Sequence, residues 1–165
     1  MGITNPTQTI LVSCRGNAKD KFSSRKILKD NLFVLDWHMQ TSFEPFLFAI
    51  SVGKTRFSHQ LIKESRVFAV NFMQYSLKDK VLYCGRRSGE HIDKFNEAGL
   101  TKQEAETIDC CRVKESLAFI ECEVMQEIET GDHTIFVAKV TKQEEKEPGK
   151  RLFHLGGDNF TTTKD

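Results

Sequence analysis

This sequence of 165 residues lacks the patterns that commonly hold a metal ion or a nucleotide phosphate. Its histidines never form H-E-x-x-H, and its cysteines never form C-x-x-C. The G-x-G-x-x-G and G-x-x-x-x-G-K-[ST] loops are missing, as is the G-x-S-x-G turn of nucleophilic hydrolases. We therefore expect no metal site and no hydrolase nucleophile, and any bound nucleotide must be held by other devices.

Long apolar runs and a strong net charge are also missing. No stretch is apolar over the length of a membrane span, and the first residues, MGITNPTQ, lack the apolar part of a signal peptide. The formal net charge of +1 creates no overall field toward nucleic acid or a membrane surface. The five cysteines are odd in number and irregularly spaced, which disfavours a secreted disulfide framework. We expect a cytoplasmic protein that binds neither nucleic acid nor membrane.

The composition is typical of a globular domain with a phenylalanine-rich core. Hydrophobic residues make up 39% of the chain and charged residues 28%, which are ordinary values for such a domain. Thirteen phenylalanines stand against one tryptophan and two tyrosines, so phenylalanine must supply most of the aromatic core. A chain of this length predicts a single domain, residues 1–165.

The first half of the chain predicts strands separated by polar segments. Apolar and β-branched runs indicate strands at residues 8–14, 32–37, 46–52 and 67–73. The basic segment 15–30 has two interpretations, a solvated connection with some helix or a nucleic-acid patch. A patch would need interleaved aromatic residues, and the segment has only one, so we favour the solvated connection.

A possible ligand site lies between the second and third of these strands and just after the third. Residues 38–45 form a polar corner that could face a flat ligand. Gly53 permits an unusual backbone conformation, and Ser58 could cap a helix that starts there. Because Lys54, Arg56 and Ser58 lie together at a predicted helix start, this turn predicts a phosphate site.

The rest of the chain predicts helices first and then strands. Residues 77–84 and 91–98 indicate helices, the second ended by Gly99, and 101–109 is a polar helical or irregular piece. In residues 118–128 apolar and polar side chains alternate, as in a half-buried strand. A turn at 130–132, a returning strand at 133–140, a solvated loop at 142–150, a last strand at 151–155 and a Gly156–Gly157 turn complete the chain. Antiparallel strands with helices inserted mid-chain predict a mainly β protein with α insertions, a closed β-barrel with helical additions.

Several residues have both an ordinary and a functional interpretation. The neighbours Cys110 and Cys111 make no zinc site, and we take them as structural. His133 follows a turn at the end of a predicted hairpin, where it is either a solvated residue of the turn or a residue that points toward a ligand. Lys94 alone is most often a surface charge, and Trp37 alone is most often core. Their common position at strand ends and loops favours a shared site.

The ordered motifs of this sequence resemble the flavin reductase family, and most of all its flavoredoxin-like branch. They are N-x-x-x-x-x-W from Asn31, S-x-x-P from Ser42, R-F-S at 56–58, V-N-F at 70–72, S-G-x-x-x-D-K-F at 88–95, I-E-C-E-V at 120–124, G-D-H-T-I at 131–135 and L-F-H-L-G-G at 152–157. The similarity covers nearly the whole chain. It departs from the family at Cys110 and Cys111, where alanine and proline are frequent.

The resemblance implies an FMN-binding split antiparallel β-barrel with peripheral helices, usually a homodimer with the flavin near the subunit interface. Arg56 and Ser58 would hold the phosphate, Trp37 and the following corner would lie along the flavin ring, and His133 would stand where nicotinamide approaches. The cofactor-binding residues that it implies are Asn31, Trp37, His38, Met39, Gln40, Ser42, Ser51, Val52, Gly53, Arg56, Phe57, Ser58, Ser88, Lys94 and Phe160, with His133 as the catalytic residue.

The expected activity is hydride transfer from NADH or NADPH to FMN, with electrons passed on to an acceptor. Such chemistry needs no side-chain nucleophile, because the cofactor carries the reaction and the protein positions it. Two alternatives stay open: a flavoredoxin-like electron carrier with protein redox partners, and a split-barrel binding protein without turnover. The sequence leaves open the nicotinamide preference, the acceptor, and whether FMN stays bound or exchanges.

Overall fold

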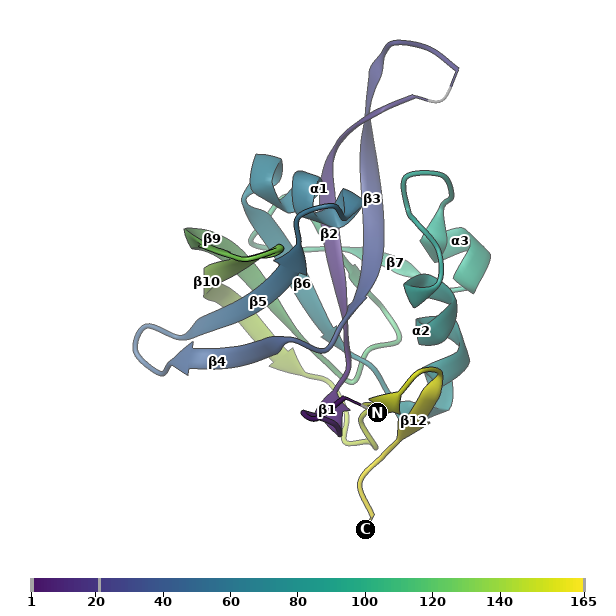
Figure 1. Ribbon diagram of the computed structural model, residues 1–165, viewed down its shortest axis with the longest axis vertical. Coiled ribbons are helices and arrows are strands. Elements are labelled where there is room, and N and C mark those ends of the chain that lie inside the picture. Colours follow the sequence, from purple (N-terminus) through teal and green to yellow (C-terminus); the bar gives the residue numbers. More distant parts are fainter. Residues whose placement is uncertain (1, 21, 165) are drawn as a thin grey trace.

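Most of the apolar runs form one seven-stranded antiparallel sheet (Figure 1). This computed structural model describes residues 2–20 and 22–164. The sheet order is β3-β2-β6-β9-β10-β5-β4. Its strands are β2 (Ile10–Lys19), β3 (Lys26–Leu35), β4 (His38–Ser42), β5 (Leu47–Gly53), β6 (Val67–Phe72), β9 (Ala118–Thr130) and β10 (His133–Glu145). The predictions of a mainly β, antiparallel fold and of strands near 46–52, 67–73 and 118–128 are confirmed.

The sheet curls but does not close, so the prediction of a closed barrel was wrong. Its two edge strands, β3 and β4, are consecutive in the chain and are joined only by Asp36 and Trp37. The described residues show no pairing between these two strands. The Trp37 carbonyl instead accepts a hydrogen bond from the Ser51 amide at 2.9 Å, which fixes the link against β5.

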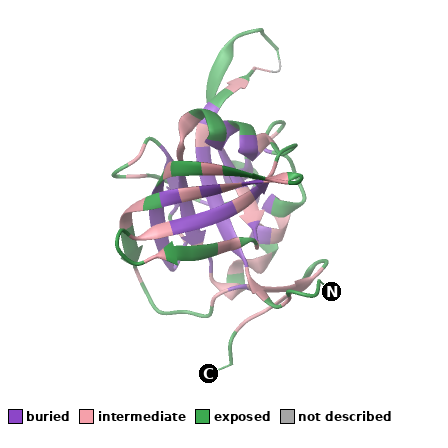
Figure 2. Cartoon of the chain, turned by 60° about the vertical axis from the view of Figure 1, so that its left-hand side comes forward, coloured by how far each residue is buried: buried purple, intermediate pink, exposed green. Residues whose placement is uncertain are grey.

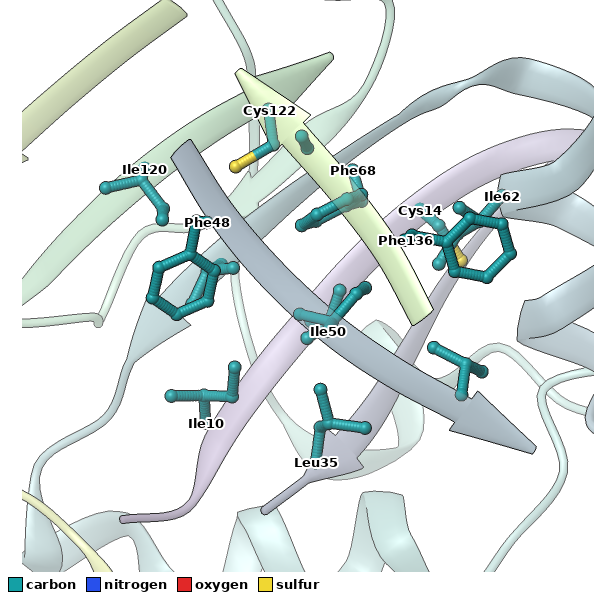
Figure 3. Packing of buried hydrophobic residues seen from close by; sticks show 14 of the residues in the cluster. Ile10, Cys14, Leu35, Phe48, Ile50, Ile62, Phe68, Ile120, Cys122 and Phe136 are labelled. Carbon is teal, nitrogen blue, oxygen red and sulfur yellow. The ribbon is translucent and has the colours of Figure 1, made fainter. Parts of the chain in front are cut away.

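Two apolar clusters fill the two sides of this curled sheet. The first lies inside the curl, where side chains from β2, β5, β6, β9, β10 and α1 (Phe57–Ser65) converge, among them Ile50, Phe68 and Phe136 (Figure 3). The second lies between the sheet and the helices α2 (Lys78–Gly85) and α3 (Lys94–Ala98). The sheet is therefore buried on both faces where the helices cover it, and strands such as β6 are apolar on both sides.

The helices begin at other residues than the sequence predicted. α1 starts at Phe57, with Arg56 as its N-cap residue and no side-chain cap, so Ser58 lies within the first turn. α3 starts only at Lys94, because the Asp93 side chain accepts a hydrogen bond from the Asn96 amide and caps it there. Gly99, with a φ of 64°, ends this helix as predicted. The 3-10 turn η1 (Tyr75–Leu77) leads into α2.

Segment 15–30 is not a helical connection but most of a long hairpin. β2 and β3 pair from Ile10 with Leu35 to Lys19 with Lys26, and the far end projects beyond the sheet (Figure 1). Arg15 and Asp30 lie opposite one another, with 2.6 Å between Arg15 Nε and Asp30 Oδ1. Because the projecting end is exposed on both faces (Figure 2), its side chains are mostly polar, and its apolar Ile27 and Leu28 are neighbours, so the alternation that reveals a strand is missing.

Five smaller predictions also need correction. The polar corner 38–45 contains the edge strand β4, and segment 101–109 contains β7 (Lys102–Glu104), which pairs with β8 (Cys111–Val113). The loop 142–150 begins within β10. Gly53 does not adopt a positive φ; it ends β5 in extended backbone. In β9 the first five residues are all buried, so the expected alternation fails there.

A small three-stranded sheet carries the two ends of the described chain. It orders β1 (Thr7–Gln8), β11 (Phe153–Gly156) and β12 (Asn159–Thr161) as β1-β11-β12. Gly156 and Gly157 have φ values of 119° and 58°, so the predicted glycine turn between β11 and β12 is confirmed. This arm lies below the main sheet beside α2 (Figure 1). In the described part of the chain, no helix is long and apolar enough to span a membrane.

Candidate functional site

A cavity of about 640 Å³ opens where the end of β3, the turn from β5 into α1, the segment after α2 and the C-terminal arm meet. It brings together residues that are more than 100 positions apart in the sequence. Predicted site residues that line it are Asn31, Trp37, Ser51, Val52, Gly53, Arg56, Phe57, Ser58, Ser88, Lys94, His133 and Phe160.

The four predicted residues on β4 do not line the cavity. His38 points to the other side of the link, where its Nε2 lies 2.8 Å from the Gln8 carbonyl and its ring stacks on Phe48. Met39, Gln40 and Ser42 belong to the edge of the main sheet. β4 pairs with β5 and turns away from the cavity, because the chain bends at Asp36 and Trp37.

The turn from β5 into α1 brings an available cation and a hydroxyl to the cavity wall. Of the two cations in the turn after β5, Lys54 is engaged with Glu129, whereas no carboxylate in residues 2–20 and 22–164 pairs with the exposed Arg56 guanidinium. Ser58 Oγ accepts a hydrogen bond from Asn31 Nδ2 at 3.2 Å, which leaves the hydroxyl proton for another acceptor. Arg56 and Ser58 can therefore both donate to an anion.

Asn31 supplies an unused acceptor in the same wall. Its Oδ1 is buried and, among the described residues, has no hydrogen-bond donor. Gly89 approaches so closely that a Cβ on it would lie 1.7 Å from this oxygen, so the segment after α2 can reach Asn31 only with glycine here. A buried acceptor without a partner is costly, so this oxygen indicates a donor on a bound molecule.

Lys94 is a buried cation at the base of the cavity. It is 4% exposed, and its Nζ donates to the carbonyls of Leu32 and Cys84, each at 2.7 Å. Burial, assisted by the positive charge of Arg56, lowers the pKa of Lys94 from 10.5 to about 8. Burial also raises the pKa of the Cys84 thiol, to about 11, so this cavity residue is no thiolate nucleophile at neutral pH.

Two aromatic rings of the cavity lining, those of Trp37 and His133, lie in contact, and a carboxylate holds one of them. The rings of Trp37 and His133 lie 4.7 Å apart between centroids, tilted by 39°. Asp132 Oδ1 lies 2.7 Å from His133 Nδ1, and this contact lowers the pKa of Asp132. If Nδ1 carries the proton toward Asp132, His133 presents Nε2 to a ligand as an acceptor when neutral and as a donor when charged.

Sequence reasoning missed four cavity residues that carry chemistry. Arg86 and Arg87 lie on the segment after α2, where Arg86 pairs with Asp158 and the Arg87 guanidinium lies 4.0 Å from the Tyr83 ring centre. Asp36 and His154 form a hydrogen bond, with 2.6 Å between Asp36 Oδ2 and His154 Nδ1. The only signals in the sequence were proximity to Trp37 for Asp36 and the L-F-H-L-G-G motif for His154.

No group of three or more His, Cys, Asp or Glu side chains within the described ranges is placed to hold a metal ion. The five cysteines are buried and free. The cavity lining instead offers cations and hydroxyls, which suit an anionic group, and rings, which suit an aromatic one.

The flavin reductase like domain matches residues 3–162. The chain belongs to this family. A relative from Archaeoglobus fulgidus, described as an uncharacterized protein, is 35% identical over 81% of this chain and 81% of its own length.

Solved structures show that this flavin reductase like chain shares its fold with flavoproteins. An FMN-binding protein from Thermus thermophilus superimposes with a TM-score of 0.84 at 24% identity, over 98% of this chain and 89% of that one. The flavoredoxin of Desulfovibrio vulgaris (Miyazaki F) gives 0.82 at 22% identity, over 100% and 91%. The expected likeness to the flavin reductase family and its flavoredoxin-like branch is confirmed.

The cavity residues of this flavin reductase like chain fit a flavin mononucleotide. A phosphate matches the free guanidinium of Arg56 and the hydroxyl of Ser58. The unpaired Asn31 Oδ1 calls for a donor, which the hydroxyls and the ring N–H of a flavin can supply. Rings in the lining provide flat apolar surface for an aromatic ligand.

Proposed function

We propose that this protein is an FMN-dependent oxidoreductase that transfers hydride from NADH or NADPH to the flavin and passes the electrons to an acceptor. The observation that supports it most is one cavity whose lining combines a free cation and a hydroxyl, those of Arg56 and Ser58, with the Trp37–His133 ring pair. This combination matches a ligand that carries both an anionic group and an aromatic ring. FMN, when bound, would supply the ring that accepts and releases hydride.

The protein's own residues would bind and orient. Arg56 and Ser58 would donate to the phosphate, Asn31 Oδ1 would accept from the ligand, and the ends of β5 and α1 would fix these groups on rigid elements. Phe160 would pack on the ligand from the C-terminal arm. None of these side chains needs to exchange a proton, because the cofactor carries the reaction and the protein positions it.

Lys94 would provide positive charge beside the ligand. With a pKa near 8 in the free protein, it is mostly charged at pH 7. A bound anion would raise this pKa, because a nearby negative charge favours the charged form. Lys94 can therefore offset negative charge on the ligand without leaving its two carbonyl partners.

His133 would position nicotinamide in the cavity. Its ring is held between Trp37 and Asp132, so its free nitrogen has a fixed direction. A donor or acceptor there can bind the carboxamide or ribose of a nicotinamide without taking part in hydride transfer itself.

We also propose a homodimer. The edge strand β4 and its surroundings expose Trp37 at 56%, Met39 at 62% and Phe43 at 89%. Large apolar side chains on a sheet edge favour association, and a closed two-fold dimer is the commonest arrangement. In such a dimer His38, Met39, Gln40 and Ser42 would lie at the subunit interface rather than in the cavity of their own chain. A cytoplasmic location is compatible with five free cysteines.

The test is a visible absorption spectrum of the purified protein with added FMN, followed by NADH or NADPH without oxygen. Flavin binding and rapid bleaching support the oxidoreductase. Flavin binding without bleaching by either nicotinamide favours the electron carrier, the alternative suggested by similarity to flavoredoxin. No flavin binding would contradict both and leave a binding protein of another kind.

A further inference from the structure

Asp36 links three segments that are far apart in the sequence. Its Oδ1 accepts a hydrogen bond from Thr9 Oγ1 at 2.7 Å, and its Oδ2 lies 2.6 Å from His154 Nδ1. Thr9 precedes β2, Asp36 follows β3, and His154 lies on β11. The carboxylate therefore ties the C-terminal arm to the edge of the main sheet, in addition to the pairing of β11 with β1.

His154 uses its second nitrogen within the arm. Its Nε2 lies 2.9 Å from the Gly157 carbonyl, and its ring lies 5.3 Å from the Phe160 ring at 33°. Carboxylate and carbonyl oxygens are both acceptors, so the ring satisfies both only as an imidazolium that donates from each nitrogen. One side chain thus holds the carboxylate, the Gly156–Gly157 turn and Phe160 together.

All these groups face the cavity. Asp36, His154, Gly157 and Phe160 belong to its lining, and Asp36 and His154 side chains are each 22% exposed. Both ring nitrogens of His154 already have protein partners, so neither is directed at a ligand as an acid or base. The geometry fits a role in placing the arm rather than one in chemistry.

We propose that Asp36 and His154 are positioning residues that hold the β11–β12 arm, and Phe160 with it, as one wall of the cavity. The inference about the ligand rests on the proposed function, since FMN is the molecule that this wall would contact. Other contacts of the arm are the pairing of β11 with β1, the packing of Phe160 against the second apolar cluster, the hydrogen bond from the Thr9 amide to the Leu152 carbonyl, and the Arg86–Asp158 ion pair at the surface. Because the Arg86–Asp158 ion pair is exposed, it adds little order to the arm.

Two variants test the contact without removing bulk. Asp36→Asn keeps the shape but loses the charge, and His154→Phe keeps a ring against Phe160 but loses both hydrogen bonds. The control is Asn159→Ala, which removes a 3.2 Å bond to the Gly156 carbonyl in the same turn and touches neither Asp36 nor the cavity.

The first readout is amide hydrogen exchange in the flavin-free protein. We expect exchange in residues 153–161 to rise about tenfold or more in both variants and to stay near wild type in the control, while β6 and β9 stay protected. Arm exchange at the wild-type rate in both variants would overturn the proposal. If one variant also loses protection in β6 and β9, the whole protein has been destabilised in it. Exchange in residues 153–161 of the other variant then decides whether the proposal holds.

The second readout is FMN affinity from quenching of flavin fluorescence. We expect both variants to bind FMN about tenfold more weakly, as expected for loss of a charge-assisted contact that orders a wall. A His154→Phe, Phe160→Leu double variant should bind no more weakly than the worse single variant, because both changes act on one wall. Additive losses would contradict the shared wall. If the wild-type protein binds no FMN, the proposed function is contradicted but the positioning role is not. Hydrogen exchange in the flavin-free protein still tests whether the Asp36–His154 contact holds the arm.

Discussion

Trp37 and His133 meet in the lining of the cavity, 4.7 Å apart between ring centroids, although 96 positions separate them in the sequence. The contact exists because β10 pairs with β5, and the register places His133 opposite Gly53. The amide of Ser51 on β5 holds the Trp37 carbonyl. β5 therefore brings both rings to one place in the cavity lining.

His133→Ala should slow reduction of bound flavin by NADH or NADPH, on the order of a hundredfold, because a positioning contact is lost. FMN affinity should stay near wild type, since Arg56 and Ser58, which would hold the phosphate, are unchanged. Anaerobic stopped-flow absorption at saturating nicotinamide measures the rate. A wild-type rate in the variant would assign His133 to the turn alone.

Arg56→Ala should weaken FMN binding by about one to two powers of ten, because a charge-assisted contact contributes roughly 1.5–3 kcal/mol. Riboflavin lacks the phosphate and should lose much less affinity. Fluorescence titration with both ligands measures the difference. Lys54→Ala is the matched control from the same turn, as its ammonium is engaged with Glu129. Equal losses for FMN and riboflavin would contradict the phosphate assignment.

The free energy of unfolding should depend on pH through Lys94. Its pKa is about 8 in the folded protein and near 10.5 when unfolded, so between these values the unfolded chain binds more protons. The contribution of Lys94 to stability therefore rises as pH increases from 8 to 10.5 and is constant below 8. Denaturant unfolding of wild type and Lys94→Met without flavin measures it. The stability of the wild type relative to the variant should increase across this interval, and a constant difference would contradict the assignment.

Glu121→Leu should lower the free energy of unfolding by about 3–5 kcal/mol, because it removes the buried carboxylate beside Arg112 and leaves that buried cation only the exposed Glu106. Glu121 is fully buried, accepts hydrogen bonds from the Glu106 and Thr107 amides, and lies 3.1 Å from Arg112 Nη1. Urea denaturation measures the loss. Glu123→Leu, an exposed position on the same strand, is the control and should cost far less.

The protein should have the mass of a dimer in light scattering with FMN bound. Met39→Glu and Phe43→Glu together should produce monomers, because charges on the β4 edge oppose its burial. A monomeric wild type that still binds flavin would contradict the dimer.

The sequence by itself determined the features that depend on near neighbours. Continuous apolar character predicted β6, and Gly99 and the Gly156–Gly157 pair predicted a helix end and a turn, because glycine adopts a positive φ without steric cost. The cation and hydroxyl of Arg56 and Ser58 share a wall because only one residue separates them. The order of motifs along the chain was enough to indicate the family.

Only the tertiary structure decided which groups meet. Glu121 belongs to an alternating run, yet it is buried because residues 105–107 and Arg112 fold over β9 and supply its partners. The bend at Asp36 and Trp37 sends β4 away from the cavity, and the same bend places Asp36 against His154, 118 positions later. Periodicity reports how one segment divides between water and core, whereas such contacts depend on register, strand order and the path of the chain between them.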